Sequence, residues 1–203
     1  METGVVLCAG TTLPADRRVE NILALDADKW TYISPVFSLK PDIFGSIYSF
    51  ETIQEAGFRE HRYVIERNCP FGPSLANWES IIVAASFLLR SGGSFITTGL
   101  VTFIIRDIEQ ERRLGRERSS DVEIQERERL EMRDPNVRRE RIKRRDDVWH
   151  EYLNGGPVVD TFKEILGRLA EIGNFIYPPT FIDIPDKLGQ EPTGYPGLIF
   201  IKK

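Results

Sequence analysis

One stretch, residues 77–100, constrains the fold of this chain more than any other. Its first half has almost no polar surface, which predicts a helix covered on most sides; the apolar positions are Ile81, Ile82, Ala84, Ala85, Phe87, Leu88 and Leu89. Gly92 and Gly93 then supply residues that tolerate positive φ, as a helix end requires. Residues 94–100 favour a strand. A helix joined by a glycine turn to a strand is half of a parallel βαβ unit, so other elements should alternate around it.

Length and composition fit a single α/β domain. The chain has 203 residues, of which 41% are hydrophobic, and this is enough for a packed core. No apolar run reaches membrane-spanning length, and no basic N-terminal region leads into an apolar segment, so we expect neither a membrane helix nor a secretory signal. Cys8 and Cys69 lack CxxC spacing. Reduced thiols in an intracellular protein, cytoplasmic or nuclear, are the simplest interpretation.

The net charge of −4 hides a strongly charged segment. Residues 109–147 contain 13 basic and 12 acidic side chains, and the rest of the chain is mildly acidic. Nucleic-acid binding through overall charge is therefore excluded, and any such contact has to be local. We predict that residues 106–147 form a charged insertion, helical or partly disordered, with breaks near Gly115 and residues 134–135. Residues 1–105 and 148–203 would form the folded domain.

The remaining apolar runs predict alternating strands and helices. We expect a short helix at residues 50–57 and an amphipathic helix at residues 158–172. The expected strands are residues 4–9, 21–25, 40–46, 61–66, 94–100, 181–184 and 198–201, and residues 30–37 form a weaker extended segment because of Pro35. This order predicts a Rossmann-like, mostly parallel sheet with helices on both faces and a C-terminal antiparallel strand pair. Ligands of such sheets bind beyond the carboxyl ends of the strands.

Several segments resemble, in order, those of one enzyme family. They are LALDAD at residues 23–28, KPDIFGSI at 40–47, YVIERN at 63–68, LLRSGGSFITTG at 88–99, and the closing pair FIDIP and GLIFIKK. In this order they resemble the class I S-adenosylmethionine-dependent methyltransferases, over roughly residues 4–105 and 158–203. The resemblance implies a Rossmann-like fold, S-adenosylmethionine as cofactor and methyl transfer as activity. The chain departs from the family in having one glycine in its first loop, and a linker too short for the usual first helix.

The resemblance assigns cofactor-binding roles to the predicted strand ends. Asp26 would accept hydrogen bonds from the ribose hydroxyls, with Ala27 beside the sugar or base; the alternative is a turn-forming aspartate. Ser46 and Ile47 would flank the adenine, although a turn serine is the simpler explanation for Ser46. The backbone of the first loop would lie under the methionine part of the cofactor, unless it is an ordinary turn; these residues are Cys8, Ala9 and Gly10.

The segment after residues 61–66 resembles the (N/D)-P-P-(Y/F) pattern of amino-methylating members. The resemblance makes catalytic candidates of Asn68, Cys69, Pro70 and Phe71, with Cys69 in place of the first proline. In the family the polar side chain orients an amine and the ring stacks on it; the alternative is a Pro-Phe turn packed on the core. We place Arg67 with the cofactor-binding residues, where it could contact a carboxylate or phosphate or simply be exposed. Methyl transfer from a sulfonium needs no metal, and we predict none.

The basic block at residues 138–145 is the candidate contact with a partner. It has six basic residues and one acidic residue, so it could bind phosphates locally, act as a nuclear import signal, or be a solvated helix. A lid or substrate clamp is a further hypothesis. The sequence thus predicts methyl transfer to an unidentified acceptor. The alternatives are a non-catalytic methyltransferase-like domain that binds protein partners through the charged arm, and a different nucleotide-binding α/β protein.

Overall fold

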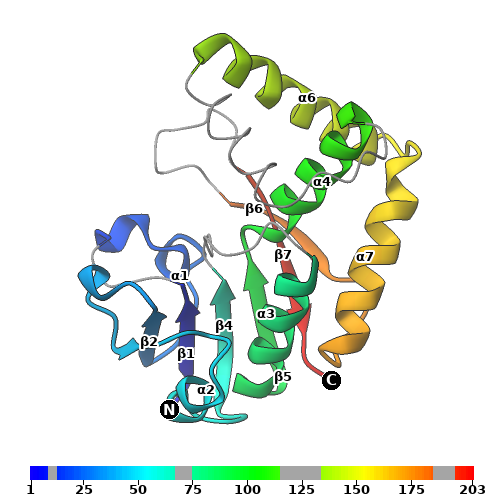
Figure 1. The fold of residues 1–203 in the computed structure, drawn as a ribbon. Coiled ribbons are helices and arrows are strands. Elements are labelled where there is room, and N and C mark those ends of the chain that lie inside the picture. Colours follow the sequence, from blue (N-terminus) through cyan, green and yellow to red (C-terminus); the bar gives the residue numbers. More distant parts are fainter. Residues whose placement is uncertain (9–12, 67–74, 115–133, 185–194) are drawn as a thin grey trace. The chain divides into compact units, whose positions relative to one another are not determined.

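The computed structural model describes residues 1–8, 13–66, 75–114, 134–184 and 195–203 (Figure 1). The chain divides into two compact units. The sheet unit consists of Met1–Val101 and Leu166–Lys203, and the helical unit consists of Thr102–Ile165. They are described separately below.

The sheet unit is built on seven strands in the order β3-β2-β1-β4-β5-β7-β6. Neighbours among the first five strands are parallel, whereas β7 is antiparallel to both β5 and β6. The bounds are β1 Thr3–Leu7, β2 Lys29–Ser34, β3 Ile43–Phe44, β4 His61–Glu66, β5 Leu89–Thr97, β6 Thr180–Ile184 and β7 Tyr195–Ile201. The predicted α/β class, mostly parallel sheet and closing antiparallel pair are therefore confirmed.

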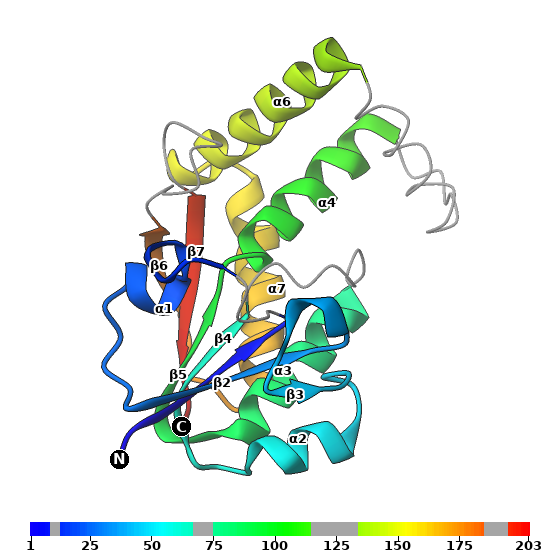
Figure 2. The same cartoon turned by 90° about the vertical axis from the view of Figure 1, so that its left-hand side faces the viewer.

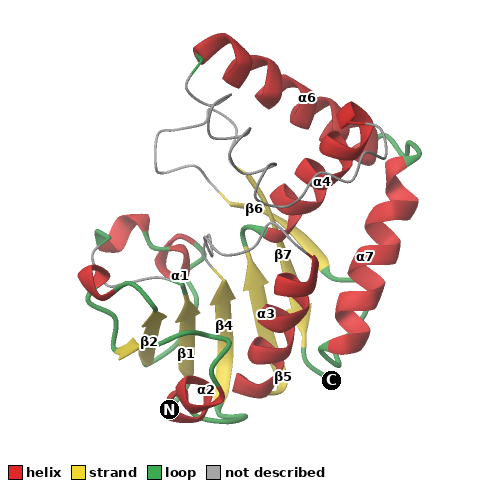
Figure 3. Ribbon diagram, viewed as in Figure 1, coloured by secondary structure: helices red, strands yellow, loops and turns green. Residues whose placement is uncertain are grey.

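Helices cover both faces of this sheet, but unequally (Figures 2 and 3). One face carries the four-residue helix α1, Val19–Ile22, whose Val19 packs in a cluster with Val6, Tyr32, Ile65 and Ile96. On the other side lie α2, Phe50–Ala56, and α3, Leu75–Leu88, together with the C-terminal part of α7, Val158–Ile172. Short 3-10 turns occur at Ala15–Arg17 and Phe37–Leu39. The first face thus depends on few covering side chains.

Strand β2 is where the sequence prediction is wrong. Residues 21–25 were expected to be a strand, but they contain the end of α1 and the turn after it. Their apolar character has another cause, because Leu23 and Leu25 pack over the sheet cluster instead of joining the sheet. The strand is Lys29–Ser34, which ends directly before Pro35, so the proline terminates the strand and does not weaken it.

The glycine pair also has a different role from the expected one. Helix α3 ends at Leu88 and β5 starts at Leu89, so Gly92 and Gly93 lie inside the strand. The register shifts there: Leu89 pairs with His61 and Ser94 pairs with Tyr63. Gly92 has a φ of +76°, which allows the extra residues of β5 to form this irregularity.

The helical unit contains most of α4, Leu100–Leu114, all of α6, Pro135–Leu153, and the first half of α7. Asp134 caps α6 by accepting a hydrogen bond from the Asn136 amide at 2.8 Å, and Pro135 occupies the first turn, as the predicted break near residues 134–135 requires. Glu109 is buried and accepts a hydrogen bond at 2.8 Å from Arg144 Nε, which joins α4 to α6. The aromatic rings of Trp149, Tyr152 and Phe162 join α6 to α7.

Candidate functional site

The strand register brings the carboxyl ends of the parallel strands to one edge of the sheet. Leu7 pairs with Ile33 and with Glu66, and Glu66 pairs with Thr97. The last pair of β2 and β3 is Ser34 and Phe44. The arrowheads of β1, β4 and β5 accordingly point the same way in Figure 1. We call this the carboxyl edge, and it is where a ligand of such a sheet is expected.

Glu66 is the central charged side chain of the carboxyl edge. It is fully buried, and its carboxylate accepts hydrogen bonds from Thr97 Oγ1 at 2.8 Å and from the Gly99 amide at 3.0 Å. Its own carbonyl accepts the Thr98 amide and hydroxyl, both at 3.3 Å. Thr97 Oγ1 in turn accepts the Leu100 amide at 3.2 Å. Glu66 therefore fixes the turn from β5 to α4, because an unpaired carboxylate could not remain buried there.

At the ends of β2 and β3 the side chains are polar or aromatic. Ser46 lies directly after β3, but its Oγ accepts the Tyr48 amide at 3.2 Å and it therefore serves a turn. Ile47 is 5% exposed and belongs to the core. Phe37 and Phe44 are 76% and 61% exposed, with ring centroids 5.6 Å apart in an edge-to-face arrangement. Two exposed rings beside the ends of β2 and β3 offer a surface on which a flat heterocycle can stack.

The predicted first-loop site falls only partly within the described residues. Cys8 follows β1 directly and has a φ of +61°, an unusual conformation for a residue other than glycine. Cys8 is disulfide-bonded, which contradicts the expectation of reduced thiols. Ala9 and Gly10 lie outside the described residues. The same holds for the predicted loop after β4, namely Arg67, Asn68, Cys69, Pro70 and Phe71.

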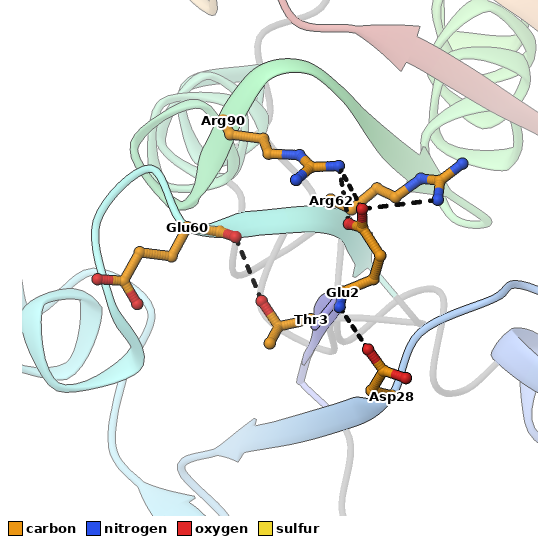
Figure 4. Close-up of polar contacts among 6 residues, drawn as sticks. All are labelled: Glu2, Thr3, Asp28, Glu60, Arg62 and Arg90. Atoms are coloured by element: carbon orange, nitrogen blue, oxygen red, sulfur yellow. Dashed lines mark hydrogen bonds and ion pairs between the residues drawn. The ribbon is translucent and has the colours of Figure 1, made fainter.

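Asp26 and Ala27 lie at the amino ends of the strands, whereas the predicted role requires them at the carboxyl edge. They precede β2 instead of following it, so they belong near the amino ends of the strands. Asp28, two residues further on, accepts the Glu2 amide at 2.6 Å, and its own amide donates to the Glu2 carbonyl at 2.8 Å. Glu2 also pairs with Arg90 at 2.7 Å, and Figure 4 shows these contacts around β1. The segment ties the amino ends together and is exposed at Asp26.

Two residues of the carboxyl edge were missed at the sequence level, Ser34 and Glu66. The signal for Glu66 was present, since an acid follows three apolar residues at a strand end. Ser34 was hidden because the strand it ends was taken as a weak segment.

No group of three or more His, Cys, Asp or Glu side chains in the described ranges is arranged to hold a metal ion. Within the same ranges, every helix is too short or too polar to cross a membrane.

Comparisons with known proteins find no matching family model and no matching curated protein. Among solved structures, the chain is similar to the 16S rRNA (adenine(1408)-N(1))-methyltransferase from Catenulisporales acidiphilia, with 12% identity and a TM-score of 0.45, over 100% of this chain and 88% of that chain. A mutant of that enzyme gives 12% identity and a TM-score of 0.48, over 100% and 88%. A structure of an antibiotic related methyltransferase gives 8% and 0.43, over 98% and 86%.

The strands themselves define the class of fold. Five parallel strands followed by an antiparallel pair form the type of α/β sheet that the resemblance to class I methyltransferases implied. At the level of the fold the resemblance is therefore confirmed.

Proposed function

We propose that this protein transfers a methyl group from S-adenosylmethionine to an acceptor at the carboxyl edge. One observation carries the proposal: two of the segments that resemble the family reach the carboxyl edge, although LALDAD precedes β2 and does not. KPDIFGSI spans β3 and its following turn, and YVIERN spans the end of β4. The edge between them is where ligands of doubly wound sheets bind.

The described residues fit the cofactor in part. The exposed rings of Phe37 and Phe44 suit stacking against adenine, whereas the buried Glu66 is held by Thr97 and Gly99 and serves the turn into α4. The activated methyl group itself needs no acid or metal to leave, so alignment of donor and acceptor is the main task of the protein. The ribose-binding acid expected at the end of β2 is replaced by Ser34, since Asp26 lies at the other edge.

Isothermal titration calorimetry with S-adenosylmethionine and its demethylated product tests the proposal. We expect saturable binding, weakened more than tenfold by Phe44→Ala. Phe50→Ala is a matched control, because Phe50 in α2 is 63% exposed, close to the 61% of Phe44, and does not lie at the end of β2 or β3. Asp26→Ala should leave the affinity unchanged. Absence of binding at millimolar cofactor would refute methyl transfer.

A nucleic-acid acceptor is the substrate class that α6 favours. Arg139 and Lys143 lie one turn apart on α6, both are exposed, and neither makes an ion pair in the part of the chain that the structure describes. Arg144 of the same block pairs with Glu109 and Glu140 and so contributes less free charge. Exposed cations on a helix bind phosphates with a steep salt dependence.

Fluorescence anisotropy with single-stranded RNA tests this acceptor class. We expect Arg139→Ala with Lys143→Ala to weaken binding and to lower the slope of log affinity against log salt by about 1.4. Lys163→Ala is the control, because Lys163 already lies 3.6 Å from Asp160. An unchanged slope would remove α6 from RNA contact.

A non-catalytic interaction domain is the second candidate, and Ser34 in place of a ribose-binding acid favours it. The calorimetry above separates the two, because this candidate requires no cofactor binding.

A further inference from the structure

The connection from β1 to β2 contains little helical structure in its described part. A crossover between adjacent parallel strands normally carries a full helix that packs on the sheet. The described part of this connection, Cys8 and residues 13–28, contains a 3-10 turn at Ala15–Arg17 and the four-residue α1. So short a helix contributes little of the packing that usually fixes the loop after the first strand. Besides the disulfide bond at Cys8, further contacts have to hold the segment that leads from the end of β1.

Polar side chains supply that support. Arg18 Nε donates to the Leu13 carbonyl at 2.9 Å, and Arg18 Nη1 donates to the Tyr32 hydroxyl at 3.2 Å. The guanidinium also lies over the Tyr32 ring, 5.4 Å from its centroid. Asn21 Nδ2 donates to the Ala15 carbonyl at 2.7 Å. Two backbone carbonyls of the segment are thus held by side chains at or in α1.

The centre of this network is the Tyr32 hydroxyl. It donates to Glu20 Oε1 at 2.5 Å while it accepts from Arg18. Burial and the neighbouring Glu20 raise the pKa of Tyr32 to about 12, so the hydroxyl keeps the proton that it donates. Tyr32 pairs with Val6 of β1 in the sheet register. The phenol therefore connects the rigid sheet to the segment that follows the loop after β1.

Burial of the Glu20 carboxylate in this network costs folding free energy. The side chain is 2% exposed, and within the described residues its Oε2 has no hydrogen-bond partner. A buried carboxylate oxygen without a donor is rare and needs an explanation beyond stability. An apolar side chain on the sheet would cover the same strands without that cost.

We propose that Tyr32, with Arg18 and Glu20, is a positioning group that holds residues 13–18 against the sheet and so orients the cofactor-binding end of β1. This inference rests on the proposed function. It assigns to three side chains the role that a first helix would have in a longer crossover. None of them needs to touch the cofactor.

Hydrogen exchange of the full chain without cofactor, followed by calorimetry with S-adenosylmethionine, tests the inference. Tyr32→Phe should speed exchange at residues 13–18 at least tenfold, leave the amides of β4 and β5 unchanged, and weaken cofactor affinity about fivefold. Tyr63→Phe is the matched control: Tyr63 lies on β4, which is separated from β2 by β1, is 9% exposed, and its hydroxyl makes no hydrogen bond in the described ranges. Glu20→Gln, which keeps an acceptor for Tyr32, should retain wild-type exchange at residues 13–18.

The outcomes separate this inference from the proposed function. Unchanged exchange at residues 13–18 in Tyr32→Phe overturns the support role, and so does uniformly faster exchange, since that would report only lost stability. Faster local exchange with unchanged affinity overturns the link to the cofactor. If the wild type binds no cofactor, the proposed function and the link to the cofactor both fail, and the exchange data still decide whether Tyr32 holds the segment.

Discussion

At the scale of single residues, buried polar side chains affect stability in ways that the pattern of apolar residues does not predict. His61 is 5% exposed, and its Nε2 donates to the Ala56 carbonyl at 2.6 Å. Among the described residues its Nδ1 has no partner. Burial lowers the pKa of His61 below its ordinary value of 6.5, although the Ala56 carbonyl and Glu60 act in the opposite direction. The folded protein therefore prefers the neutral ring.

This preference makes stability depend on pH. The unfolded chain binds the proton near pH 6.5, while the folded chain binds it only at lower pH. The contribution of neutral His61 is therefore complete above pH 6.5 and is lost as the pH falls from that value through the lower pKa of the folded state. We expect the free energy of unfolding, measured with urea between pH 7.5 and 5, to fall more in the wild type than in His61→Gln. Glutamine keeps a donor for the Ala56 carbonyl.

The second histidine provides the control. His150 is exposed on α6, and the chain has two histidines in all. His150→Gln removes this exposed imidazole and is the variant to compare with His61→Gln. Equal slopes in all three proteins would mean that His61 is protonated as easily in the folded state as in the unfolded chain.

At the same scale, the candidate site was only partly predictable. The strand at residues 61–66 and the turn after β3 were predicted, because strand-forming and turn residues follow one another in those segments, whereas the cofactor role of Ser46 stays a prediction. Asp26 was misplaced because residues 21–25 are apolar for packing and not for pairing. The Arg18–Tyr32–Glu20 network left no signal, since its members are brought together only by the fold of α1 onto β2. Local pattern cannot show such tertiary contacts.

At the scale of elements, close packing of side chains on neighbouring strands leaves no space for a side chain at Gly4 of β1. Gly4 of β1 pairs with Trp30 of β2 and with Tyr63 of β4. The two rings stack across it, with centroids 6.1 Å apart and planes 23° from parallel. A Cβ at Gly4 would overlap the Trp30 ring. The glycine is therefore required by the aromatic pair, and not by backbone conformation.

Gly4→Ala should destabilise the protein by about 1–3 kcal/mol, because the Trp30 ring has to leave its place between the strands. Urea denaturation followed by tryptophan fluorescence measures both the loss and the change around Trp30. Gly167→Ala is the control, since its Cβ would meet Tyr177 at 3.9 Å and α7 would gain helix propensity of about 0.5–1 kcal/mol. The interpretation fails if both variants change stability alike.

Lys202, directly after β7, also connects elements of the fold, because it contacts α3 and the residue after α7. Its Nζ donates to Ser86 Oγ of α3 and, at 2.8 Å, to the Gly173 carbonyl after α7. Lys202→Met should cost about 1–3 kcal/mol of unfolding free energy, because the carbonyl and hydroxyl lose their donor. Lys203→Met, at the exposed end of the chain, should cost almost nothing. Equal losses in the two variants would contradict a specific role for Lys202.

At the scale of the whole molecule, the sequence predicted the order of strands and helices. It did not predict how the helices cover the two faces of the sheet. Alternating apolar runs led to the parallel sheet and its closing pair, since each strand needs a core-facing side. The linker was expected to be too short for the usual first helix, but the polar contacts that support the four-residue α1 are not visible in composition. The charged segment was expected to lie outside the folded domain, and this stays a prediction.

Replacing residues 106–147 with a short Gly-Ser linker should therefore leave a cooperative thermal transition. The deletion removes Glu109 and Arg144 together, so no buried carboxylate is left without its partner. Arg144→Ala in the full chain is the informative contrast, since it leaves Glu109 buried and unpaired at a cost of about 3–5 kcal/mol. Calorimetry should show a single sharp transition for the deletion and a destabilised helical unit for Arg144→Ala. A broad, non-cooperative transition in the deletion variant would show that the charged segment is part of the folding core.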